Sequence, residues 1–398
     1  MTHSFQEYQL IDNLRHYVAP TYSANKLSVW HRVPVSRRSA VFVLLFLGKM
    51  GELRVLLTKR SSKLRNFPGH VALPGGKADN GLESEWTVSR REMHEETGLS
   101  SDDEALKLLG VSIEHITLMP SYLSRTFSCV RPCVGFMKFD TTINHSHVED
   151  IEETIISRLN ISLNPGESSS IFSCPLKDFL YPTPCEKSST TPSPALEALE
   201  RVSYRIKWGG IPWHLRSYIF LQNNTHEVDW LKHIKDLSAS EDDEIGNELD
   251  SEDKESVTPP PYRSKSPVTP TESTSNKASN TKASRKKKLS SWGRLGSRKL
   301  EDTNEKIYDV WGLTANILHD LSEIVYLKGN KNKEHVYGEE EMIYCLHDFG
   351  HLMRHKERSE EEVKLIHSTS VGDDENEFGF HMILPPEDFK RLNKLYKL

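Results

Sequence analysis

Residues 73–99 constrain the fold of this chain more than any other segment. They begin with a Pro-Gly-Gly sequence at 74–76, which is a signal for a strand that runs into a tight turn. From Leu82 the apolar residues follow helical spacing, and Gly98 is a natural stop because glycine adopts the left-handed conformation that ends many helices. The segment therefore predicts a turn followed directly by a helix.

Three glutamates share one edge of that predicted helix. Glu92 lies one turn before both Glu95 and Glu96, and Arg91 lies one turn before Glu95. Like charges at this spacing cost roughly a few tenths of a kcal/mol per pair, and one arginine offsets only part of that cost. Two interpretations are open: a solvated acidic face, or a site for a divalent cation such as Mg²⁺, which binds carboxylate oxygens and keeps several waters.

The spacing of the segment resembles the Nudix box, here residues 76–99. Gly76 is followed after six residues by Glu83 and after seven more by Arg-Glu-Met-His-Glu-Glu-Thr-Gly-Leu at 91–99. The first interval is one residue longer than in the usual box, so Glu85 is an alternative to Glu83. The resemblance implies an α/β fold, the Nudix α/β/α sandwich with a mixed β-sheet.

The same resemblance implies roles for the box residues. Glu92, Glu95 and Glu96 are expected to be catalytic and to bind the metal, Mg²⁺ or Mn²⁺, and Arg91 is expected to orient them through ion pairs. The implied reaction is hydrolysis of a diphosphate linkage, in which the metal polarises phosphoryl oxygens and helps to generate the attacking hydroxide.

The residues before the box resemble a narrower family. Residues 56–79 are similar to the motif that precedes the box in coenzyme A diphosphatases, with Leu73 in place of an aromatic residue. Further similarities to the fungal peroxisomal members lie at 122–127, 163–167, 175–176 and 311–314. The resemblance implies that coenzyme A and its oxidised or acyl derivatives are hydrolysed to adenosine 3',5'-bisphosphate and 4'-phosphopantetheine or its derivative.

Four cations lie within seven residues shortly before the box: Lys59, Arg60, Lys63 and Arg65. With Gly75 and Gly76, we expect them to bind substrate, because coenzyme A carries a 3'-phosphate in addition to its diphosphate. A basic surface turn after a strand has the same pattern, so both interpretations stay open.

The rest of the chain combines folded and low-complexity parts. Only 36% of the 398 residues are hydrophobic, and residues 238–303 have too few apolar side chains to offset the entropy of ordering, which predicts a long disordered insertion there. We expect residues 1–237 to form the main part of the Nudix domain and residues 304–398 to form a helical part that completes it. Periodicity predicts helices over 5–18, 307–326 and 389–395, a hairpin of strands 39–47 and 53–58, and strands over 127–139 and 216–221.

The net charge of −6 gives no basic field for nucleic acid or anionic membranes, so neither is expected as a partner. The insertion at 238–303 leaves a protein partner open. The family resemblance implies a peroxisomal location, although the last three residues match a Ser-Lys-Leu signal only at Lys397 and Leu398, and a cytoplasmic location is the alternative.

Two other functions stay open. The same chemistry on ADP-ribose, a dinucleotide or capped RNA would use the same box. A non-catalytic module that binds nucleotides is expected to have lost box carboxylates, and all of them are present here.

Overall fold

The computed structural model describes residues 10–19, 28–64, 66–139, 159, 161–180, 196–234, 236–237, 299–300, 303–328, 336–368 and 378–397. Arg65 and nearly all of the predicted disordered insertion at 238–303 lie outside the described residues. The start of the helix predicted over 5–18 lies outside them too, and residues 10–15 are helical as predicted.

An eight-stranded mixed sheet forms the centre of the described structure. β1 (Arg38–Leu47) pairs in parallel with β7 (Cys129–Phe139) and forms an antiparallel hairpin with β2 (Leu53–Arg60), which confirms the predicted hairpin. The strand predicted over 127–139 is confirmed as β7. The remaining strands pair antiparallel with their neighbours: β3 (Val71–Ala72), β4 (Gly75–Lys77), β5 (Val111–Leu118), β6 (Tyr122–Leu123) and β8 (Ser168–Pro175).

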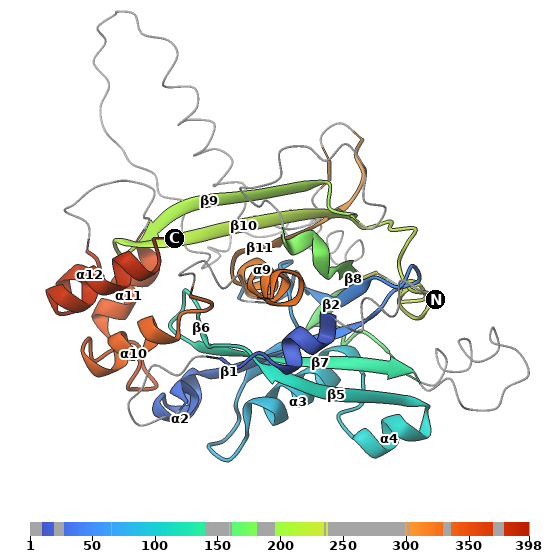
Figure 1. The fold of residues 1–398 in the computed structure, drawn as a ribbon, viewed down its shortest axis with the longest axis horizontal. Helices are drawn as coiled ribbons and strands as arrows, with labels where there is room; N and C mark the ends of the chain where they lie inside the picture. Colours follow the sequence, from blue (N-terminus) through green and yellow to red (C-terminus); the bar gives the residue numbers. More distant parts are fainter. Residues whose placement is uncertain are drawn as a thin grey trace, which may run out of the picture.

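Helices cover both faces of this sheet. Successive side chains of a strand point to opposite faces, and the buried even-numbered residues of β1 pack in one cluster with α3 (Glu85–Thr97). The buried odd-numbered residues of β1 pack in another cluster with α9 (Gly312–Leu327). Figure 1 shows the two helices on opposite sides of the sheet. The predicted α/β/α sandwich around a mixed sheet is therefore confirmed.

A second, three-stranded antiparallel sheet covers the far side of α9 (Figure 1). It consists of β9 (Glu200–Trp208), β10 (Ile211–Leu221) and β11 (Ile307–Trp311). The strand predicted over 216–221 lies within β10. Because α9 lies between two sheets, every residue from 315 to 325 is buried, as expected for a helix enclosed on all sides.

The helix predicted over 307–326 is wrong in its first five residues. Residues 307–311 form β11, in which Val310 pairs with Tyr218 of β10, and the helix begins only at Gly312. Ile307, Tyr308 and Val310 are β-branched or aromatic residues that pack well in a sheet. The tertiary pairing with β10 therefore overrides the helical spacing.

The C-terminal helices form a group at one end of the molecule with α2 (Val29–Arg32) (Figure 1). They are α10 (Glu340–Asp348), α11 (Glu360–His367) and α12 (Pro386–Leu395), and α12 confirms the helix predicted over 389–395. Shorter helical segments are α4 (Asp103–Leu108), α6 (Asp229–Lys232) and the 3₁₀ turns Val35–Arg37, Leu176–Leu180 and Phe380–Met382. In the part of the chain that the structure describes, no helix is long and apolar enough to cross a membrane.

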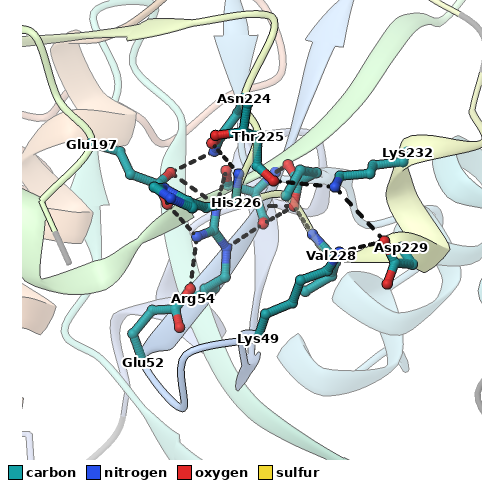
Figure 2. A network of polar contacts seen from close by, with 12 residues as sticks. Lys49, Glu52, Arg54, Glu197, Asn224, Thr225, His226, Val228, Asp229 and Lys232 are labelled. Carbon is teal, nitrogen blue, oxygen red and sulfur yellow. Dashed lines mark hydrogen bonds and ion pairs between the residues drawn. The ribbon is translucent and has the colours of Figure 1, made fainter. Parts of the chain in front are cut away.

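A buried ion cluster fixes the start of β2 to the loops that flank the second sheet (Figure 2). The guanidinium of Arg54 is fully buried, and its Nη1 lies 2.8 Å from Glu52 and 2.7 Å from Glu197. Its Nη2 lies 3.9 Å from Glu227. Because these carboxylates come from separate segments, the cluster holds the two sheets in a fixed relation.

Candidate active site

The box begins where β4 runs against β1 without room for a side chain. A Cβ atom on Gly75 would lie 2.5 Å from the carbonyl oxygen of Ala40, so only glycine fits this backbone approach. The loop after β4 leads into α3, where the Ser84 side chain accepts a hydrogen bond from the Thr87 amide and caps the helix. The helix ends at Gly98, whose φ of 73° lies in the left-handed region. The predicted turn, helix and glycine stop are all confirmed.

Arg91 ties the box glutamates together. Its Nε lies 3.0 Å from Glu83, and its Nη1 lies 2.9 Å from Glu92 and 3.3 Å from Glu95. Its Nη2 donates to the carbonyl oxygen of Lys77 at 2.9 Å, which joins the helix to β4. Of the two alternatives from the sequence, Glu83 makes the ion pair with Arg91, whereas Glu85 is buried at the first position of α3.

Glu92 lies directly against the box glycine. A Cβ atom on Gly76 would lie 2.3 Å from the carboxyl carbon of Glu92, so the absence of a side chain at 76 makes room for this carboxylate. Burial raises the pKa of Glu92, and its ion pair with Arg91 opposes that rise. The carboxylate is therefore held in a partly desolvated position beside the turn.

Glu96 is the most buried of the three glutamates, with an exposed fraction of 9%. Its carboxylate accepts hydrogen bonds from the Thr58 hydroxyl at 3.2 Å and from the Gly75 amide at 3.4 Å. Burial raises the pKa of Glu96 to about 7, against the opposing field of Arg60, and the charge of Glu92 contributes to the rise. A further cation beside this carboxyl group would therefore favour its ionised form.

The donor set fits a hard divalent cation. Glu92 and Glu96 offer carboxylate oxygens in a desolvated setting, and Glu95 extends from the same helix with its side chain 48% exposed. Among the described residues, no group of three or more His, Cys, Asp or Glu side chains is placed to hold a metal ion by itself. Mg²⁺ does not require three protein ligands, because it commonly binds one or two carboxylates and takes its other ligands from water and substrate phosphates.

The four predicted substrate-binding cations are not equivalent in the structure. Lys59 is buried within β2, Lys63 is exposed in the turn that follows, and Arg65 lies outside the described residues. Arg60 is the cation whose field reaches Glu96. Its Nε is buried and finds no hydrogen-bond acceptor in the part of the chain that the structure describes. Arg60 is thus a cation close to the carboxylates, with one donor that no described residue pairs.

Sequence reasoning missed two features of the site. Thr58 holds Glu96 from the neighbouring strand, and alternation along β2 was the only local signal for it. His70, which precedes β3, lies against Trp311 at the end of β11, with ring centroids 5.1 Å apart. No local pattern indicated this contact, because it depends on how the second sheet packs over the first.

Comparisons with known proteins place this geometry in a family. A model of the NUDIX domain matches residues 36–192, which include the box. Peroxisomal coenzyme A diphosphatase 1 of Saccharomyces cerevisiae is 35% identical over 360 residues, which cover 90% of this chain and 88% of the yeast protein. A peroxisomal coenzyme A diphosphatase of Caenorhabditis elegans is 30% identical over 148 residues, covering 36% of this chain and 51% of that protein.

Solved structures resemble smaller parts of the chain. The crystal structure of a C. elegans Ap4A hydrolase is 20% identical, covers 35% of this chain and 81% of its own, and superposes with a TM-score of 0.24. The similarity to the yeast protein, in contrast, extends over nearly the full length of both chains. Together with the NUDIX domain match, this shows that the chain belongs to the Nudix hydrolases.

Proposed function

We propose that this Nudix hydrolase cleaves the diphosphate linkage of coenzyme A, and of its oxidised or acyl derivatives, with Mg²⁺ or Mn²⁺. The products are adenosine 3',5'-bisphosphate and 4'-phosphopantetheine or its derivative. The observation that carries the proposal is the 35% identity with a yeast coenzyme A diphosphatase over 90% of the chain. The position of Arg60, a cation close to Glu96, supports it.

In this proposal the box residues have different roles: the glutamates bind the metal, and Arg91 positions them. Glu92, Glu95 and Glu96 would hold the cation, the first two through carboxylates that also pair with Arg91. Arg91 keeps Glu92 and Glu95 in register through ion pairs at 2.9 and 3.3 Å. A divalent ion bound there polarises phosphoryl oxygens and lowers the pKa of water.

The remaining residues position the substrate and the carboxylates. Arg60 meets a phosphate of the substrate. The Gly75 amide donates to Glu96, and Gly76 leaves room for the carboxylate of Glu92. Attack of water on one phosphorus forms a new P–O bond and breaks the bridging P–O bond. The departing phosphate keeps the bridging oxygen, and the protons of water are shared between the two products and solvent.

The direct test is chromatography of coenzyme A after incubation with the full-length protein and Mg²⁺. We expect release of adenosine 3',5'-bisphosphate by the wild type and a loss of most turnover in Glu95→Gln. Glu104→Gln is the matched control, because this glutamate is 78% exposed on α4 and pairs only with a nearby lysine in the same helix. Cleavage of ADP-ribose alone would keep the diphosphatase chemistry and reject the coenzyme A assignment.

A second test addresses Arg60. Arg60→Ala is expected to raise KM for coenzyme A more than for coenzyme A without its 3'-phosphate, because it removes a cation that meets the additional charge. Lys107→Ala is the control, because this lysine is 60% exposed on α4 and pairs with Glu104 of the same helix. Equal increases in KM for both substrates would refute a role in 3'-phosphate recognition.

We also propose that the protein resides in peroxisomes. The names of the yeast and C. elegans relatives support this location. Imaging should use a fluorescent tag placed within 238–298, so that the native C-terminus stays free. Diffuse cytoplasmic fluorescence would favour the alternative.

A further inference from the structure

Three ring side chains form a row next to the carboxylate site. The ring centroid of His70 lies 5.3 Å from that of Phe67 and 5.1 Å from that of Trp311. Phe67 and His70 belong to the loop between β2 and β3, whereas Trp311 ends β11, far along the chain. The row is thus assembled only when the second sheet packs over the first.

The exposed end of the row is held in an unfavourable backbone conformation. Phe67 is 51% exposed, and its φ of 54° lies in the left-handed region that side chains such as phenylalanine rarely adopt. Two backbone hydrogen bonds hold the loop: the Arg60 amide donates to His70 at 2.9 Å, and the His70 amide donates to Phe67 at 3.4 Å. The loop therefore presents a large apolar ring to solvent despite a conformational cost.

A cation lies beside the row and joins it to the carboxylates. The field of Arg60 acts on both His70 and Glu96. Burial and then the charge of Arg60 lower the pKa of His70 to about 4, so its ring is neutral at physiological pH. The buried Nε of Arg60 finds no acceptor among the residues described. A row of rings, inclined to one another by 61° and 51°, thus lies beside a cation whose Nε has no acceptor among the described residues.

We infer that the exposed ring of Phe67, with the rings of His70 and Trp311 in a row beside it, forms a stacking surface for the purine ring of a nucleotide substrate, and that Arg60 binds a phosphate of the same nucleotide. The two parts of a nucleotide match the two parts of this site. A purine has a flat π-face that stacks on an aromatic ring, and a phosphate accepts hydrogen bonds from a guanidinium. This inference deepens the proposed function by assigning the purine half of the substrate to the loop between β2 and β3, where it meets the end of β11. It rests on the proposed function in one respect: the substrate must be a purine nucleotide.

The test measures binding of two ligands that contain no diphosphate and cannot be cleaved. AMP and ribose 5-phosphate are titrated calorimetrically into the full-length wild type, Phe67→Ala and Phe67→Tyr. Phe67→Ala should weaken AMP binding roughly 5- to 100-fold, the range expected for one stacked base, and leave ribose 5-phosphate unchanged. Phe67→Tyr should retain the wild-type affinity for AMP.

Phe349→Ala is a matched control, because Phe349 is also 51% exposed but lies at the C-terminal cap of α10. It should bind both ligands as the wild type does. If Phe67→Ala weakens both ligands equally, or neither, the stacking surface is refuted. A wild type that prefers AMP but leaves coenzyme A intact would refute the proposed function and not this inference.

A second readout isolates Trp311. AMP should quench part of the protein's tryptophan fluorescence, and Trp311→Phe should remove that change while calorimetry still shows AMP binding, because phenylalanine also stacks. The chain has seven tryptophans, so the comparison with this variant identifies the source of the signal. An undiminished fluorescence change in Trp311→Phe would remove Trp311 from the purine site.

Discussion

The guanidinium of Arg37 lies 2.7 Å from the carboxylate of Glu362, and each side chain is only 2% exposed. Arg37 immediately precedes β1, and it also donates to the carbonyl oxygens of Phe127 at 3.1 Å and His355 at 3.0 Å. The other oxygen of Glu362 accepts from the Met353 amide at 2.7 Å. One buried ion pair thus fixes the C-terminal helices to the strand that supports the box.

Glu362→Leu is expected to destabilise the protein by about 3–5 kcal/mol, because it leaves the buried charge of Arg37 without its partner. Chemical denaturation at pH 7 measures the change. Asp348→Asn is the control, since its pair with Arg32 is partly exposed and is expected to contribute less than about 1 kcal/mol. A loss in Glu362→Leu no larger than in the control would show that the pair does not hold the C-terminal helices in place.

Gly76→Ala should leave the fold intact and reduce kcat about 100-fold. The added Cβ would lie only 2.3 Å from the carboxyl carbon of Glu92, so this flexible side chain must move away. Small displacements of reacting groups cause losses of that order. Gly81→Ala, five residues along the same loop, is the control because its Cβ would meet only Val35 at an ordinary 3.6 Å. Steady-state kinetics with coenzyme A, with circular dichroism for the fold, separates the two. Equal activity in both variants would contradict a role for the Glu92 position.

The sequence predicted the site where its information is local. The helix from Glu85 to Thr97, its stop at Gly98 and the shared edge of the glutamates all depend on spacing within a few turns, and the structure has each of them. The ion pair of Arg91 with Glu95 follows from the same i+4 geometry.

Features that depend on distant pairing were not predictable in the same way. Residues 307–311 read as the start of a helix because their partner strand β10 is separated from them by the long insertion. The support of Glu96 by Thr58, and the contact of His70 with Trp311, likewise arise only when separate strands come together. Local periodicity does not predict which strands will pair with each other.

Arg54→Met should destabilise the protein by about 3–5 kcal/mol, because Glu52, Glu197 and Glu227 would remain largely buried without their shared cation (Figure 2). Urea unfolding at pH 7 provides the measurement. Lys49→Met, at a nearby residue that Figure 2 also shows, is the control. Lys49 and Asp229 are 36% and 46% exposed, so their ion pair is expected to contribute less than about 1 kcal/mol. Similar small losses in both variants would refute the stabilising role of the cluster.

Glu96→Gln should stabilise the metal-free protein at high pH. The folded-state pKa of Glu96 is about 7 and its ordinary value is 4.5, so the folded state favours the protonated carboxyl. That contribution to stability is fully present below pH 4.5 and is lost as the pH rises through 7. Glutamine carries no such dependence, so the variant should exceed the wild type by about 1–3 kcal/mol at pH 8 and match it near the ordinary pKa of the carboxyl.

Urea unfolding at about pH 5, 6.5 and 8, in a chelator or with added Mg²⁺ in its place, measures these differences on both sides of the Glu96 pKa. Mg²⁺ should raise the stability of the wild type at pH 8, because it binds the ionised carboxylate of the folded state, and should raise that of Glu96→Gln much less. A gap between the two proteins that does not change with pH would refute the raised pKa. Equal stabilisation of both proteins by Mg²⁺ would instead place the cation away from Glu96.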